Sequence, residues 1–93
     1  MKLKQIANIL DDCTECDIYE DLPYGLDEPL FVNLIGEEIH GKYVDGIKIE
    51  DCAVTGMWVD EDRGYNLVII IDMSHHRERK RRQREKEKQN VSR

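Results

Sequence analysis

The fold is decided by residues 52–72, which read CAVTGMWVDEDRGYNLVIIID. Two apolar runs, 52–59 and 65–72, contain many β-branched and aromatic residues and flank the polar segment DEDRG. This pattern predicts two strands joined by a hairpin turn. The second run is apolar without a break from Val68 to Ile71, which is typical of a central strand covered on both faces. Gly56 inside the first run indicates either a bulge or a close approach of another backbone segment.

The residues before this hairpin predict one helix and further short strands. Apolar side chains recur at helical spacing over residues 2–12, at Leu3, Ile6, Ala7 and Leu10. Residues 16–20 and 30–35 predict strands, residues 36–46 predict a loop that contains one helical turn, and another extended run begins at Ile47–Glu50. Because the strands follow one another by short connections, we expect an α+β domain with an N-terminal amphipathic helix and an antiparallel meander of about four strands.

The charges divide the chain into two parts. Residues 1–76 hold 17 acidic and 5 basic residues, whereas residues 77–93 hold 9 basic and 3 acidic residues. The net charge of −6 therefore conceals an acidic part and a basic part. This division predicts an acidic domain over residues 1–74 and a basic arm over residues 75–93.

The basic arm carries too few apolar groups to pack as a fixed element. Residues 75–90 have no apolar side chain, so no face of a helix there can be buried. Ser74 is the expected N-cap, and Glu78–Arg82 is an expected stabilising pair. Isolated helices of this length are marginal in water, so we expect a partly helical arm that frays.

The arm also predicts contacts to the phosphates of a nucleic acid. The candidate residues are its clustered cations, namely Arg77, Arg79, Lys80, Arg81, Arg82 and Arg84. Binding through them would depend strongly on salt. The arm has no aromatic side chain for base stacking, which argues against sequence readout on single strands. The alternative is a solubilising arm that folds onto the acidic body or a neighbouring subunit, which is the usual role of such a charge run.

The acidic part predicts a surface that could bind a basic groove of another protein. One dense cluster is Asp60, Glu61 and Asp62, and the nearby Trp58 and Tyr65 are candidate interface anchors. An acidic surface of this kind can imitate a phosphate backbone and speed the encounter with a basic partner. The alternative for the cluster is ordinary hairpin-turn chemistry in an exposed loop.

The remaining reactive residues favour no catalytic or metal site. Cys13 and Cys16 form one C-x-x-C pair, whereas structural zinc usually needs two such pairs, and Cys52 makes the number of cysteines odd. Buried or incidental thiols are the favoured interpretation over metal or redox chemistry. No G-x-S-x-G or glycine-rich phosphate loop is present. We therefore expect neither an enzyme nor a bound metal or cofactor.

Size and hydropathy predict the setting in which the chain works. A body of about 75 residues buries one modest core, which makes a homo-oligomer a reasonable expectation. The longest apolar run, Leu67 to Ile71, is far shorter than a membrane span, and the first residues do not read as a secretory signal. We expect a cytoplasmic protein.

Three stretches carry a resemblance to a known group of proteins. They are the opening MKLKQIANIL, the following CDIYED, and the closing pattern from IKIED to NLVIIID. In these the chain resembles the small accessory proteins of phage and prophage genomes. The resemblance implies a role in countering bacterial defence, either by blocking a nuclease effector, as anti-CRISPR proteins do, or by sequestering a nucleotide messenger. It assigns no functional residues.

Together these features leave three hypotheses open. The leading one is a non-enzymatic phage-type binding protein that inhibits a host defence protein through its acidic surface. The first alternative is a nucleic-acid-associated protein that acts through the basic arm. The second alternative is an oligomeric sponge for a nucleotide messenger, which would need cations near a pocket at a subunit interface.

Overall fold

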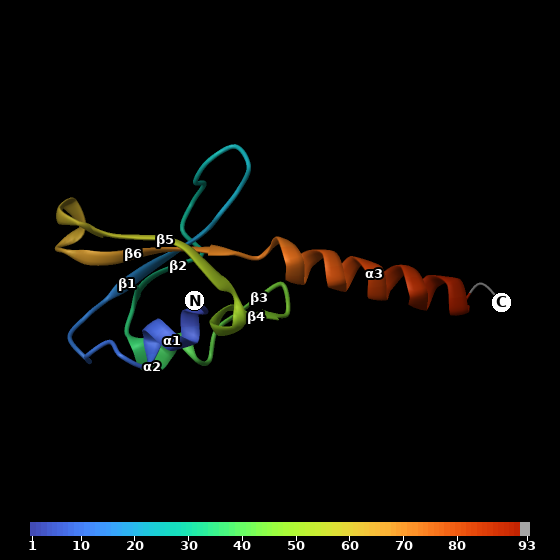
Figure 1. The fold of residues 1–93 in the computed structure, drawn as a ribbon, viewed down its shortest axis with the longest axis horizontal. Helices are drawn as coiled ribbons and strands as arrows, with labels where there is room; N and C mark the ends of the chain where they lie inside the picture. The colour runs from blue at the N-terminus through green and yellow to red at the C-terminus, as the bar shows by residue number, and fades with distance from the viewer. Residues whose placement is uncertain (92–93) are drawn as a thin grey trace.

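A four-stranded sheet forms the centre of the computed structural model, which describes the backbone of residues 1–91 and the side chains of residues 1–84. The strands lie in the order β2-β1-β6-β5. Two short helices, α1 (Leu3–Ala7) and α2 (Gly36–Ile39), cover one face of this sheet, and the β1–β2 loop rises on the other side (Figure 1). The four strands are β1 (Cys16–Glu20), β2 (Phe31–Leu34), β5 (Ala53–Asp60) and β6 (Asn66–Asp72). The α+β class predicted from the sequence is confirmed.

The expectation of a purely antiparallel meander is wrong, because β1 and β6 are parallel. Their register runs from Cys16 opposite Leu67 to Glu20 opposite Ile71, whereas β1–β2 and β5–β6 are antiparallel. The reason lies in β6, whose residues Val68–Ile71 are all buried. A strand that is apolar on both faces is typically a central strand, with a hydrogen-bonded neighbour at each edge, and here those neighbours are β1 and β5. The long connection between β1 and β6 allows the crossover that parallel pairing requires.

The core lies between the sheet and the two short helices. Leu3 and Ile6 of α1 are buried in one cluster with Ile18, Ile69 and Ile71 of the central strands. The helical spacing that predicted an amphipathic helix is therefore confirmed for its first turns. Because β6 places alternate side chains on opposite faces, Ile69 and Ile71 meet α1 while Val68 and Ile70 face the other side.

Helix α1 is shorter than the predicted range of 2–12. It ends at Ala7, and Ile9 is exposed. Asp11 explains the early end, because its Oδ1 accepts the backbone N–H of Cys13 (3.0 Å) and the hydroxyl of Thr14 (2.7 Å). Such local side-chain bonds compete with helical hydrogen bonds.

A small second sheet follows α2; the extended run predicted from Ile47 is confirmed for Ile47–Lys48, but its pairing with residues 43–44 was not predicted. The sheet is a hairpin of β3 (Tyr43–Val44) and β4 (Ile47–Lys48), followed by the 3-10 helix η1 (Ile49–Asp51). Its turn residues Asp45 (φ 52°) and Gly46 (φ 77°) both have positive φ, as a type I′ turn requires. Asp-Gly is a strong sequence signal for this turn, and we had assigned the stretch to a loop.

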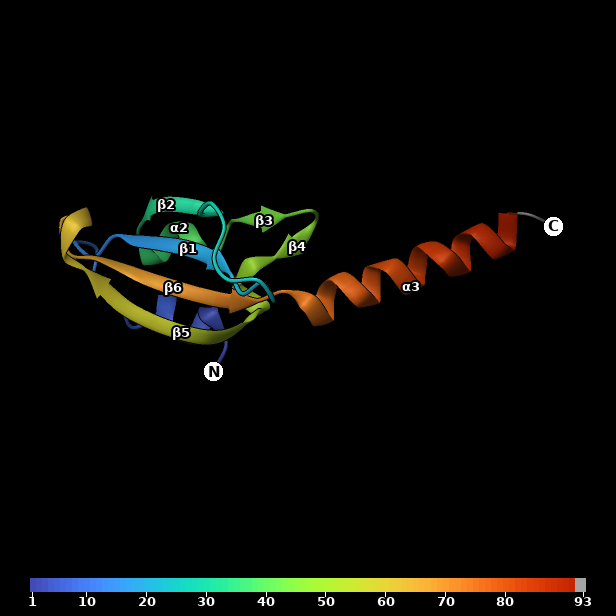
Figure 2. The same cartoon turned by 90° about the horizontal axis from the view of Figure 1, so that it is seen from above.

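The β5–β6 hairpin agrees with its prediction in detail. The 3-10 helix η2 (Glu61–Arg63) and Gly64, which has φ 68°, join the two strands. The register shifts between Val54 and Gly56, so the predicted bulge is confirmed. Strand β5 lies at the edge of the sheet, and its far end carries the turn well away from α1 (Figure 2).

Helix α3 (Ser74–Val91) leaves the end of β6 and projects from the body (Figures 1 and 2). Ser74, predicted as the N-cap, is instead the first helical residue. Asp72 accepts its N–H (2.9 Å) and its hydroxyl (2.6 Å). The predicted pair between Glu78 and Arg82 is present at 3.0 Å.

Candidate functional site

The root of α3 is held against the body by Arg77. Its Nε and Nη2 donate to the two carboxylate oxygens of Glu20 at the end of β1, at 2.9 and 2.8 Å. Its Nη1 donates to Asp45 Oδ2 in the β3–β4 turn at 2.7 Å. These hydrogen bonds, first to Glu20 and then to Asp45, raise the pKa of Arg77 above its usual value. One guanidinium thereby joins three elements that are distant in sequence.

A second contact between α3 and the β3–β4 turn comes from Lys80. Its Nζ donates to the backbone oxygen of Asp45 at 2.6 Å. The ammonium occupies the place where a Cβ at position 46 would lie, so only glycine fits there without a shift. The hydrogen bond from Arg77 lowers the pKa of Asp45, which keeps this carboxylate charged. The β3–β4 turn therefore binds the root of α3 through both the side chain and the backbone of Asp45, and the glycine leaves room for the Lys80 side chain.

Four of the six predicted phosphate-binding residues share one face of α3. They are spaced as i, i+3, i+4 and i+7, which places them one above another on a helix. We call this set the basic stripe: Arg77, Lys80, Arg81 and Arg84. With Asp45 and Ile47 they line an open groove of about 460 Å³. Arg81 and Arg84 are exposed at the outer end of the stripe, whereas Arg77 and Lys80 contact the body.

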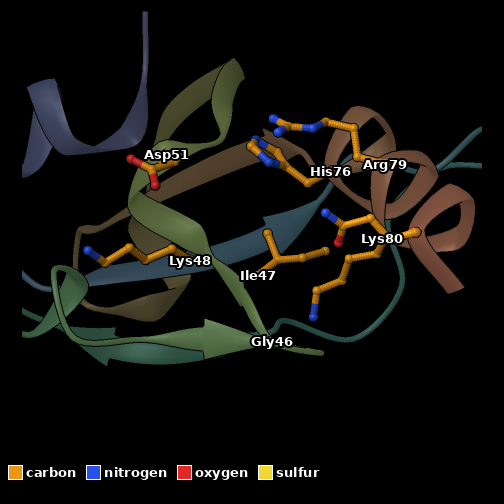
Figure 3. A pocket seen from close by; sticks show the side chains of 8 residues that line it. Gly46, Ile47, Lys48, Asp51, His76, Arg79 and Lys80 are labelled. Atoms are coloured by element: carbon orange, nitrogen blue, oxygen red, sulfur yellow. The ribbon is translucent and has the colours of Figure 1, made fainter. Parts of the chain in front are cut away.

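The other two predicted residues lie outside the stripe. Arg79 and Arg82 are both exposed, and Arg82 pairs with Glu78. Arg79 lines a second groove, of about 230 Å³, between α3, the β3–β4 hairpin and η1. Figure 3 shows His76, Arg79 and Lys80 on its helix side and Lys48 and Asp51 on the other. This open groove widens the positive surface at the root of α3.

The five predicted partner-binding residues gather at the far end of the β5–β6 hairpin. We call residues 58–65 the hairpin tip; it contains Trp58, Asp60, Glu61, Asp62 and Tyr65. Its two aromatic side chains are exposed. Asp60 Oδ1 accepts the backbone N–H of Asp62 at 3.0 Å, so the turn role considered for this cluster is confirmed for Asp60. The hairpin tip and α3 lie at opposite ends of the molecule (Figures 1 and 2).

A buried polar cluster supports the hairpin tip, and it was not predicted from the sequence. Asp17 Oδ2 accepts from Arg63 Nε at 3.1 Å, and its Oδ1 accepts from Asn66 Nδ2 (3.1 Å) and the Asn33 N–H (3.0 Å). Burial on its own would raise the pKa of Asp17, but these hydrogen bonds outweigh it and lower the pKa below the usual value of an aspartate. The sequence signal for this cluster was a polar residue inside each of two strands, Asp17 in β1 and Asn66 in β6. This signal could not predict their contact without the knowledge that β1 and β6 are neighbours.

The three cysteines have different surroundings. Cys13 is exposed in the turn after α1, whereas Cys16 and Cys52 are buried in the core. Burial raises the pKa of both buried thiols to about 11, so they are protonated and poorly nucleophilic at neutral pH. Within the part of the chain that the structure describes, no group of three or more His, Cys, Asp and Glu side chains is placed to hold a metal ion.

Comparisons with known proteins returned no match: no family model, no curated protein and no solved structure is similar to this chain. Over the described residues, no helix has the length and apolar character needed to cross a membrane. The function therefore has to be argued from the two ends of the molecule.

Proposed function

We propose that this chain is a non-enzymatic nucleic-acid-binding protein that contacts phosphates through α3. The observation that carries the proposal is the basic stripe on a helix that projects from the body. Arginine side chains on an exposed helix can reach the phosphates of a groove or of a flexible strand. The projecting position argues against an arm that folds onto the acidic body, because among the side chains that the structure describes those of α3 that bond to the body, Arg77 and Lys80, lie at its root.

Electrostatics allow this arrangement despite the acidic body. Residues 1–76 have a net charge of −12 and repel a polyanion. Charges are screened over about 8 Å at physiological salt, whereas Arg84 lies ten residues, or about 15 Å, along α3 from Ser74. Apart from Asp45, with which Arg84 shares a groove, the acidic groups of the body are therefore largely screened from the outer arginines. Phosphate contacts of this kind position a nucleic acid without reading its sequence.

The test is fluorescence anisotropy with a labelled DNA duplex of random sequence and a labelled RNA single strand, over a range of salt. One variant replaces three exposed arginines of α3 by glutamine: Arg81, Arg82 and Arg84. The matched control makes the same change in net charge on the body, at Lys2, Lys4 and Lys42, which line neither of the two grooves described above. Each lost phosphate contact should lower the salt slope by about 0.7–0.9, so the α3 variant should bind far more weakly and the control much less so. Equal effects of both variants, or no binding by the wild type at low salt, would contradict the proposal.

A second candidate function is supported by the hairpin tip. Its exposed Trp58 and Tyr65 lie beside Glu61 and Asp62, an arrangement in which aromatic anchors are rimmed by charges. On this basis the protein would be a phage-type inhibitor that places the tip on a basic groove of a host defence nuclease. The leading hypothesis from the sequence thus remains a proposal.

The second candidate is tested by plasmid survival in cells that carry a nuclease defence system, with and without this protein. Replacing Glu61 and Asp62 by lysine keeps the turn contact of Asp60 and should abolish any protection. Replacing Asp27 and Glu28, which lie in the exposed β1–β2 loop, makes the same charge change elsewhere and should preserve it. Protection that survives the tip substitutions would exclude the tip as the interface.

A further inference from the structure

Strand β5 offers an open edge to a partner. It is the last strand in the order β2-β1-β6-β5, and over residues 55–59 (TGMWV) it has neither charge nor proline. Only its beginning is covered within the described chain: Leu3 N–H donates to Cys52 O (2.9 Å), and Val54 N–H donates to Met1 O (2.8 Å). Edge strands are usually protected by charges, proline or a covering segment. From Thr55 to Val59, the only protection of this edge that the described residues supply is the bulge next to Gly56.

The same segment also exposes apolar side chains. Met57, Trp58 and Val59 are 51%, 48% and 55% exposed. Because side chains alternate along a strand, these three residues present apolar surface on both faces of the sheet at the open edge. A strand added to this edge would satisfy its backbone groups and bring its own side chains beside all three.

We infer that the occupant is a second copy of this chain, paired through its own β5 in antiparallel orientation. The covered start of the edge limits the register. Because Lys2 pairs with Ala53 and Met1 with Val54, the partner strand can pair only from Thr55 onward. Its other end is Asp60. In a twofold antiparallel pair each residue and its own copy lie on the same face of the sheet, so the axis must pass through a residue that lies opposite its own copy. Centring the pair on Trp58 places Gly56 opposite Asp60 and Met57 opposite Val59, and one continuous sheet crosses both subunits.

Charge complementarity favours this occupant over an unrelated strand. Glu61 and Asp62 follow one end of the β5 edge, and Lys2 lies at the other. At the Lys2 end a groove is lined by Lys2, His75, His76 and Arg79, together with two carboxylates that already have partners: Asp51 pairs with Lys4, and Asp72 accepts hydrogen bonds from Ser74. Antiparallel pairing brings the acidic tip of each copy to this groove of the other, twice per dimer. Parallel pairing would place like charges together.

The dimer would change how α3 is presented. The root of α3 and the hairpin tip lie at opposite ends of β6, so twofold pairing places the two α3 helices at opposite ends of the joined sheet. Met57, Trp58 and Val59 would be covered at the centre. This assembly does not depend on nucleic-acid binding, and either proposal can fail alone.

The first experiment measures the mass of the full chain by sedimentation equilibrium and follows tryptophan emission over the same concentrations. Trp58 is the single tryptophan, so its emission reports on this interface alone. We expect the mass to rise from 11.0 kDa to twice that value, with a shift of the emission to shorter wavelength. A monomer at every concentration, or a dimer without an emission shift, would overturn the inference.

Two sets of variants test the interface and its register. Met57→Lys places a charge on the β5 edge and should give a monomer, whereas Val32→Lys does the same on the opposite edge strand, at a side chain 46% exposed, and should leave the dimer intact. Glu61→Lys with Asp62→Lys should weaken the dimer, and adding Lys2→Glu with Arg79→Glu should restore it. Circular dichroism confirms that each variant folds. A dimer disrupted by Val32→Lys but not by Met57→Lys, or a failure of the charge swap to restore pairing, would contradict it.

Discussion

Both the hairpin tip and α3 are held to the body by an arginine, but the carboxylates that these arginines contact differ in burial. At the hairpin tip, Arg63 is 46% exposed and contacts Asp17, whose side chain is only 2% exposed. At the root of α3, Arg77 is 37% exposed and contacts Glu20 and Asp45, which are 14% and 67% exposed. Buried polar groups are costly to leave unpaired, whereas exposed ion pairs contribute little to stability. The same chemistry therefore fixes the tip firmly and holds α3 loosely.

The difference agrees with what each end is proposed to do. A hairpin that pairs with a second copy or a partner protein works best when its strands are already in place, because ordering them on binding costs affinity. A basic arm needs only to reach phosphates and tolerates adjustment at its root. Four substitution experiments can break or sharpen this contrast.

The largest effect is expected from Asp17→Ala, with Glu20→Ala as its matched control on the same strand. Removing Asp17 leaves the Asn33 N–H and part of the Asn66 amide without an acceptor, and should lower the free energy of unfolding by about 2–3 kcal/mol. Removing Glu20, whose side chain is 14% exposed, breaks a partly exposed pair and should lower the free energy of unfolding less, by about 1 kcal/mol. Chemical denaturation measures both. Similar losses for the two variants would show that burial does not separate the two ends.

Lowering the pH should remove part of the stabilisation that the Asp17 carboxylate provides. The pKa of Asp17 is lowered in the folded state, so its stabilisation is complete at pH values above its unfolded pKa and is lost as the pH falls through the folded value. Asp17→Asn should therefore be clearly less stable than the wild type at pH 7, and the gap should narrow below about pH 4. Denaturation curves at several pH values provide the measurement. A gap that stays constant down to low pH would mean that the charge of Asp17 does not matter.

The sequence predicted the elements whose signals are local. The β5–β6 hairpin, its bulge at Gly56 and the central place of β6 followed from alternation, turn residues and an unbroken apolar run. The location of Trp58 and Tyr65 in the hairpin tip could also be predicted, because a hairpin brings together the residues on either side of its turn.

What the sequence did not predict depends on contacts between distant segments. The parallel pairing of β1 with β6 brings Asp17 beside Asn66, and nothing near either residue indicates this. The attachment of Arg77 to Glu20 and Asp45 has the same origin, because a cation in a basic run looks like any other until its neighbours are known. The β3–β4 turn differs, since its Asp45-Gly46 signal was present.

A smaller effect is expected at two glycines with positive φ, one at each end. In Gly64→Ala at the tip, the added Cβ meets no other atom. The substitution should lower the free energy of unfolding by about 1 kcal/mol, because alanine disfavours the left-handed backbone conformation. Gly46→Ala adds a collision with the Lys80 ammonium to the same strain, so its loss of stability should be larger and α3 should loosen. Thermal denaturation of both variants tests this. Equal costs would mean that Lys80 moves away freely and contributes nothing to the root of α3.

The smallest effect on global stability, and the most selective effect on α3, is expected from Arg77→Ala. The pairs of Arg77 are partly exposed, so the free energy of unfolding should fall by at most about 1 kcal/mol. Hydrogen exchange should nevertheless accelerate in the first turns of α3 and in the β3–β4 turn, while β6 stays protected. Lys80→Ala, which removes only the bond to the Asp45 backbone, should accelerate the same amides less. Because exposed ion pairs are screened, high salt should reproduce the Arg77→Ala pattern in the wild type. Exchange that remains slow throughout α3 in Arg77→Ala would show that the helix is held by something other than this guanidinium, and the contrast between the two ends would no longer hold.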